Sequence, residues 1–186
     1  MTQMQIWSFA LGAILLVPAL FALAAPAKAA AAAVAFPRAK AAGWILSAVA
    51  WAGAAREIAR MNIDVFDMFL NRFPAEPWIL GFVLCVLCML FMPDLLPIRA
   101  VSGIMMLFPT SLFHVTRLEE SDWRLAIVSY AYVCLTAGMF FMFYPWHARR
   151  MLAWLAAKKC RIAAATGTAA ALGALFVALA LTAFAR

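Results

Sequence analysis

The charged residues of this chain are few and clustered, and long apolar runs separate the clusters. Only 12% of the residues are Asp, Glu, Lys or Arg. The hydrocarbon core of a bilayer is about 30 Å thick and needs roughly 20 apolar helical residues to cross it. Several runs reach or approach that length, which predicts that lipid surrounds most of the chain: 6–25, 78–92, 125–144 and 162–185.

These runs predict helices rather than barrel strands. Backbone polar groups must be paired internally in lipid, so a span is either a helix or part of a closed barrel. Barrel strands alternate in polarity over about ten residues, whereas these runs are continuous and rich in Ala and Leu. We therefore predict an all-α fold, a polytopic transmembrane helical bundle forming one domain over 1–186. The six expected spans cover about 6–25, 41–55, 78–92, 98–115, 125–144 and 162–185.

Some expected spans leave alternatives open. The fifteen residues 41–55 would cover only about 22 Å as a helix, so this span either thins the bilayer or continues past Arg56. The spans 78–92 and 98–115 are also short, and the alternative is four full spans plus a short re-entrant pair. The run 6–25 resembles a signal peptide, but no Lys or Arg precedes it. Because a signal peptide has a basic start, we favour an uncleaved first span.

Two connecting segments carry local expectations. The segment 26–40 is predicted to be an Ala-rich linker, in which Pro37 breaks any helix arriving from Ala29. Proline removes a backbone donor and clashes with the preceding turn, which is why it ends helices. The basic segment 145–161 is predicted to contain a short surface helix over 151–159.

The segment 56–73 is amphipathic. Its polar residues recur every three or four positions and so share one helical face: Arg56, Arg60, Asp64, Asp67 and Asn71. One interpretation is an interfacial helix lying on the membrane with its apolar side down. The other is a continuation of the second span whose charged stripe lines a polar path, because ionisable groups inside a membrane are costly and tend to be functional.

The basic residues are distributed unevenly between the two sides that six spans would define. The connections 26–40, 93–99 and 145–161 hold nine basic residues and one acid, whereas the other side holds six basic residues and seven acids. Because Lys and Arg favour the cytoplasmic side, the pattern predicts a bacterial inner-membrane protein with both termini in the periplasm. The nine basic residues are Lys28, Arg38, Lys40, Arg99, Arg149, Arg150, Lys158, Lys159 and Arg161.

The net charge of +7 does not indicate nucleic-acid binding. These cations lie in short connections at a membrane surface, where anionic lipid headgroups are the available partner. The expected headgroup contacts are His147, Arg149, Arg150, Lys158, Lys159 and Arg161.

Sulfur-bearing side chains form a stripe on the third expected span. Cys85, Cys88, Met89 and Met92 follow an i, i+3, i+4, i+7 spacing. Thiolates and thioethers are soft ligands that suit Cu(I), so handling of that metal is one hypothesis. Core packing by polarizable side chains is the interpretation that we favour, and we expect no metal or other cofactor.

The last expected span carries small residues at four-residue spacing, in two sets: Ala163, Gly167 and Ala171, then Ala170, Ala174 and Ala178. Such stripes let helices approach closely in lipid. They serve either packing within the chain or association with another subunit, and the sequence leaves both open.

No set of residues in the sequence predicts catalysis. The chain has no Gly-rich phosphate-binding loop, no H-E-x-x-H and no evident nucleophile–base pair. We expect a non-catalytic integral membrane protein that is an accessory or structural subunit or a self-associating module. The alternative is a small oligomeric transporter or channel with a path lined by the 56–71 stripe. The expected partners are membrane lipids and either further copies of the chain or a larger membrane complex.

Overall fold

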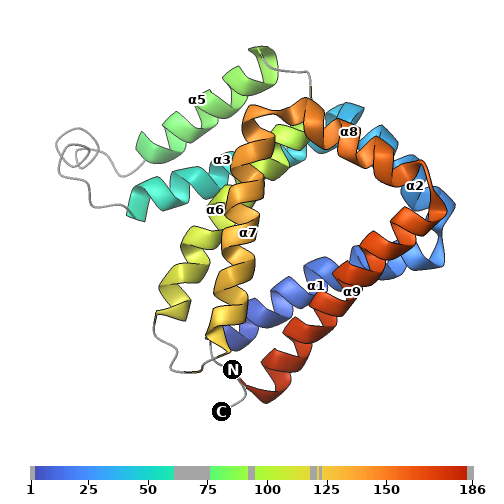
Figure 1. Cartoon of the computed structure of the whole chain (residues 1–186). Helices are drawn as coiled ribbons and strands as arrows, with labels where there is room; N and C mark the ends of the chain where they lie inside the picture. The colour runs from blue at the N-terminus through green and yellow to red at the C-terminus, as the bar shows by residue number, and fades with distance from the viewer. Residues whose placement is uncertain (1–2, 61–75, 92–94, 118–120, 122, 184–186) are drawn as a thin grey trace. The chain divides into compact units, whose positions relative to one another are not determined.

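The computed structural model describes residues 3–60, 76–91, 95–117, 121 and 123–183. Within these ranges the chain is helical and has no strand, which confirms the all-α prediction. Figure 1 labels the helices along the chain. Their bounds are α1 (Gln3–Ala24), α2 (Pro26–Ala35), the 3-10 turn η1 (Phe36–Arg38), α3 (Lys40–Arg60), α5 (Glu76–Phe91), α6 (Leu96–Thr116), α7 (Arg124–Phe143), α8 (Pro145–Ala156) and α9 (Lys159–Thr182).

Four of the described helices are long and apolar enough to cross a membrane: α1, α6, α7 and α9. The apolar part of α5, Trp78–Phe91, falls short of that length. Helix α3 has 21 residues but carries Arg56, Glu57 and Arg60 in its last five positions. These findings indicate a multi-pass membrane protein, while the count of six spans and the re-entrant pair stay predictions.

Three helices differ most from the predicted segments. The segment expected to be a linker forms helix α2 over ten residues before η1 interrupts it at Pro37. Alanine has the highest helix propensity of all residues, and five alanines in a row precede Val34. Helix α3 continues five residues beyond the apolar run that ends at Ala55, which agrees with the alternative of a helix that continues past Arg56. The surface helix begins at Pro145 rather than at Met151, because proline is well suited to the first helical position.

The described chain packs as two compact units. The first unit contains the described residues of 1–35, 108–134 and 147–186, and the second those of 36–107 and 135–146. Helices α6 and α7 each contribute one part to each unit. The single domain over 1–186 stays a prediction.

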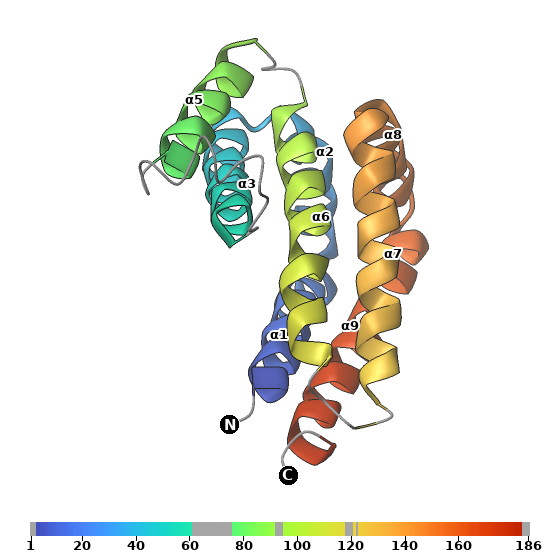
Figure 2. The same ribbon diagram turned by 90° about the vertical axis from the view of Figure 1, so that its left-hand side faces the viewer.

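In the first unit, α1 and α9 run side by side in opposite directions (Figures 1 and 2). Near one end, Gln5 Nε2 donates to the carbonyl oxygen of Ala180 at 3.1 Å. In the middle, Gly12 and Gly173 allow the two backbones to meet. A Cβ atom at Gly173 would lie 3.1 Å from the carbonyl oxygen of Gly12. Glycine therefore sets the distance between these two helices.

A buried apolar cluster joins this helix pair to the parts of α6 and α7 that belong to the same unit. Its members are Met4, Leu11, Leu112, Ile127, Ala131, Phe176 and Leu179. Aromatic rings extend it: the Tyr130 and Phe176 ring centroids lie 5.1 Å apart, at an interplanar angle of 69°. Edge-to-face pairs of this kind add to the stabilisation from area burial.

In the second unit, α3 packs against α5 (Figures 1 and 2) and against the first part of α6. Gly81 of α5 lies against α3, since a Cβ atom there would come within 3.0 Å of Ala55 Cβ. Gly43 of α3 likewise faces Pro97 at 3.1 Å. On α7, a Cβ atom at Gly138 would lie 3.0 Å from the carbonyl oxygen of Ser102 on α6. Small residues again mark the closest helix contacts.

Candidate functional site

The charged stripe predicted over 56–71 is described only at its start. Arg56 and Arg60 lie in the last five residues of α3, whereas Asp64, Asp67 and Asn71 lie outside the described residues. Arg60 Nη1 lies 3.6 Å from Glu57 Oε1. Glu57 is buried, with 7% of its surface exposed. From the sequence, Glu57 enters only the charge count of the two membrane sides. Its i, i+3 spacing to Arg60 is nevertheless a sequence signal for an ion pair.

The predicted headgroup contacts lie on two helices. His147, Arg149 and Arg150 are exposed on α8. Lys158 and Lys159 are also exposed where α9 begins, and Arg161 follows in its first turn. Together these six residues form what we call the basic segment. Their binding of lipid stays a prediction.

Arg161 makes two contacts across the junction between α8 and α9. Its Nη1 donates to the carbonyl oxygen of Trp154 at 3.0 Å. Its guanidinium also lies over the Trp154 ring, 4.0 Å from the centroid. Both contacts join the end of α8 to the start of α9, so Arg161 has a structural role as well.

The sulfur stripe divides between two surroundings. Cys85 is buried, and its Sγ lies 3.9 Å from Ser47 Oγ on α3. Cys88 lines the cavity that is described next. Met89 follows Cys88 on α5, and Met92 is outside the described residues. In the described part of the chain, no three His, Cys, Asp or Glu residues come together as a metal site. Soft-metal handling therefore stays a hypothesis without further support.

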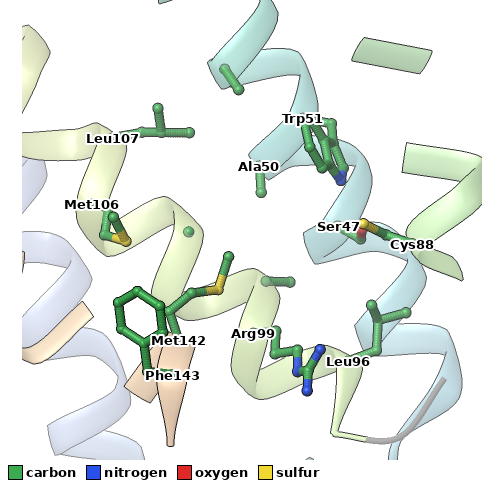
Figure 3. Close-up of a pocket in the computed structure, with 13 residues that line it drawn as sticks. Ser47, Ala50, Trp51, Cys88, Leu96, Arg99, Met106, Leu107, Met142 and Phe143 are labelled. Carbon is green, nitrogen blue, oxygen red and sulfur yellow. The ribbon is translucent and has the colours of Figure 1, made fainter. Parts of the chain in front are cut away.

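A cavity of about 450 Å³ lies within the second unit (Figure 3). It is bounded by α3, α5, the first part of α6 and the end of α7. Among the described residues that line it, Arg99 is the charged one, and most of the others are apolar or small. Figure 3 shows Arg99 and Leu96 toward one end of the cavity and Trp51 and Leu107 toward the other. From the sequence, Arg99 is predicted only to contribute to the orientation of the chain in the membrane.

The small residues of α9 lie on two different faces. Gly173 and Ala180 are buried on the face toward α1. The opposite face exposes what we call the α9 stripe: Ala163, Gly167, Ala171, Ala174 and Ala178. A Cβ atom built at Gly167 meets nothing within 4 Å. The sequence leaves open whether the small residues serve packing within the chain or association with another subunit. In the structure, the close contact within the chain is at Gly173, and the α9 stripe is exposed.

No protein family, curated protein or solved structure matches this chain. The four long apolar helices indicate the class of this chain, a multi-pass membrane protein.

Proposed function

We propose that this chain is a non-catalytic membrane protein that associates with further copies of itself through α9. The observation that carries the proposal is the exposed α9 stripe, with an open position at Gly167. A glycine inside a helix costs about 1 kcal/mol of helix stability relative to alanine. At Gly167 no packing contact within the chain compensates for that loss. Close approach of a second helix supplies that contact, since small residues at four-residue spacing are typical of helix interfaces in lipid.

The packing of α9 supports association through this face. Only 22% of its most apolar 18-residue window is buried within the chain. The buried part packs against α1 and against Tyr130 of α7, whereas the stripe residues are exposed and a Cβ atom at Gly167 would meet nothing within 4 Å. In a bilayer, the apolar remainder of α9 faces either lipid or another helix.

The experiment measures self-association in lipid. Fluorescently labelled protein is reconstituted at increasing protein-to-lipid ratios, and dimer formation is followed by energy transfer or by subunit counting. Gly167→Leu should raise the protein density needed for half-association by about tenfold, which corresponds to about 1.4 kcal/mol. Thr168→Leu is the matched control, because Thr168 is exposed on the same helix but off the stripe.

Two results would contradict this function. Wild-type protein that stays monomeric at every density would remove the association itself. If Gly167→Leu and Thr168→Leu weaken self-association equally, then the stripe is not the surface through which the copies associate. A different protein that co-purifies in a fixed ratio from native membranes, with no self-association, would instead favour the accessory-subunit form of the hypothesis.

The proposed location is the bacterial inner membrane, with both termini in the periplasm. Support comes from the nine basic residues in the connections 26–40, 93–99 and 145–161. The exposed cations of the basic segment would then face the anionic cytoplasmic leaflet.

Transport remains the alternative function, and one observation favours it. Glu57 is a buried acid paired with Arg60 at the end of α3, and buried ionisable groups in membrane proteins often mark ion or substrate pathways. Cysteines placed at Arg60 and Asp64 would be labelled from both membrane sides if they line such a path. Labelling from one side alone, with transport unaffected by Asp64→Asn, would favour the interfacial helix.

A further inference from the structure

The cavity of the second unit is amphipathic. Arg99 lies in the first turn of α6, and Gly103, Met106 and Leu107 follow on the same helix face at intervals of four, three and one residues. Leu107 is eight residues beyond Arg99, a rise of about 12 Å along the helix. A cationic group therefore lies near the helix end, and an apolar lining extends from it toward the middle of the span.

Water is a poor occupant of this cavity. A volume of about 450 Å³ corresponds to about fifteen water molecules, and each would need two to four polar partners. Apart from Arg99, the described lining offers few: the Ser47 hydroxyl, which is already close to the Cys85 sulfur, the Trp51 indole N–H and the Cys88 thiol. An apolar chain is the better match for the remaining walls, which include Ala50, Met106 and Phe143.

We propose that this cavity is a binding site for an anionic membrane lipid, with one acyl chain inside it and the headgroup phosphate on Arg99. The volume falls within the range of about 300–1,000 Å³ that is usual for ligand sites. Arg99 is half-buried and its Nε is buried, so a phosphate there would meet the guanidinium partly out of water. Arginine suits this role because its planar fork of donors matches phosphate oxygens.

The position of Arg99 along α6 agrees with this occupant. The first turn of a spanning helix lies at the membrane–water boundary, where lipid phosphates are concentrated. The acyl chain would then follow the cavity toward Leu107, as acyl chains run from the boundary toward the bilayer centre. Zwitterionic lipids carry the same phosphate, but Arg99 would repel their cationic headgroup end, so the charge favours anionic lipid. The apolar lining favours a lipid over a free phosphate.

Gly103 shows that the cavity has room that a side chain could occupy. A Cβ atom there would meet Ala50 Cβ at 3.7 Å, an ordinary contact distance. A leucine at this position would project into the space proposed for the acyl chain. The site does not depend on self-association through α9, so either proposal can fail without the other.

The test is native mass spectrometry of the delipidated full-length protein. Dioleoyl phosphatidylglycerol and dioleoyl phosphatidylcholine are titrated separately, because they share acyl chains and differ in charge. We expect one phosphatidylglycerol to bind wild-type protein roughly tenfold more tightly than phosphatidylcholine. Arg99→Gln should remove that preference, and Gly103→Leu should weaken the binding of both lipids. Inorganic phosphate should not compete.

Matched controls isolate the site. Arg117→Gln removes an exposed arginine at the other end of α6 and should keep the preference, and Thr168→Leu should keep binding of both lipids. If Gly103→Leu does not fold, Ala54→Leu fills the same cavity from α3. The proposal is overturned if Arg99→Gln keeps the preference, if the folded cavity-filling variant binds both lipids normally, or if phosphate displaces the lipid. Loss of the preference on neutralising Arg149 and Arg150 alone would move the lipid to the basic segment.

Discussion

Replacement of Gly173 by alanine tests whether glycine sets the spacing of α1 and α9. The added Cβ atom would lie 2.7 Å from Leu16 Cγ and 3.1 Å from two backbone atoms, the Gly12 carbonyl oxygen and the Leu16 nitrogen. Carbon atoms pack best at about 3.5–4.0 Å, so relief of the Leu16 Cγ contact takes roughly 0.8 Å, and relief of the two backbone contacts takes a local helix separation of roughly 0.4 Å. The backbone contacts leave no flexible side-chain end that could move away instead.

The size of the effect follows from two opposing contributions. Overpacking of a close contact costs about 1–3 kcal/mol, whereas glycine-to-alanine in a helix gains up to about 1 kcal/mol in propensity. Gly167→Ala on the same helix isolates the second contribution, because its Cβ atom meets nothing within 4 Å. We therefore expect Gly173→Ala to be less stable than Gly167→Ala by about 1–3 kcal/mol.

The assay is reversible unfolding in mixed micelles of mild detergent and dodecyl sulfate, followed by tryptophan fluorescence. Trp7 is a suitable local probe, since it is on α1 and its ring lies 5.8 Å from that of Phe108 in the same unit. Wild type, Gly173→Ala and Gly167→Ala are measured at one protein concentration, low enough that the protein is monomeric, so that the contact proposed for Gly167 between copies does not contribute. If the two variants agree within about 0.5 kcal/mol, the size expected of an uninvolved surface position, then glycine does not set the helix spacing.

Three further predictions concern other contacts. Gly138→Ala should destabilise the protein by about 1 kcal/mol or more in the same unfolding assay, because its Cβ atom would lie 3.0 Å from Met106 Cγ and from the Ser102 carbonyl oxygen. Arg161→Ala should change the emission of Trp154 and cost only about 0.5–1 kcal/mol, and an unchanged spectrum would contradict the stacking. Cys160 is exposed where α9 begins, so a single-cysteine variant keeping it should react with an impermeant thiol reagent in inside-out vesicles but not in intact spheroplasts. The reverse labelling would invert the proposed orientation.

The sequence predicts best those helices whose ends are marked by charge or proline. Helix α7 is expected over 125–144 and covers Arg124–Phe143, because Arg124 precedes the apolar run and Pro145 follows it. For helix α3 the apolar run ends at Ala55, and the sequence leaves open whether the helix stops there or continues past Arg56. The structure shows that it continues to Arg60, since Arg56 and Glu57 are both good helix formers. A change in polarity marks where a helix leaves lipid, and it does not mark where the helix stops.

The cavity could not be predicted from the sequence. Its lining comes from positions as distant as Ser47 and Phe143, and only the packing of α3, α6 and α7 brings them together. The spacing of Arg99 and Gly103 on one face of α6 is visible in the sequence, but many helices have such spacing without a cavity beside it. The basic segment is the opposite case, since its residues are close together in the sequence and could be located from the sequence alone.

The glycines of this chain link the packing to both proposals. For seven of the eight glycines a Cβ atom would have a neighbouring atom within 4 Å; Gly167 is the exception, and Gly103 has the loosest contact of the seven. Because glycine weakens a helix unless close approach compensates, these two positions are where the two proposals place an occupant from outside the chain. At Gly167 the open face is a stripe of alanines, which suits a second helix, whereas at Gly103 the space adjoins a half-buried arginine, which suits a lipid. One physical rule therefore underlies both proposals, and the surrounding side chains distinguish the two proposed partners.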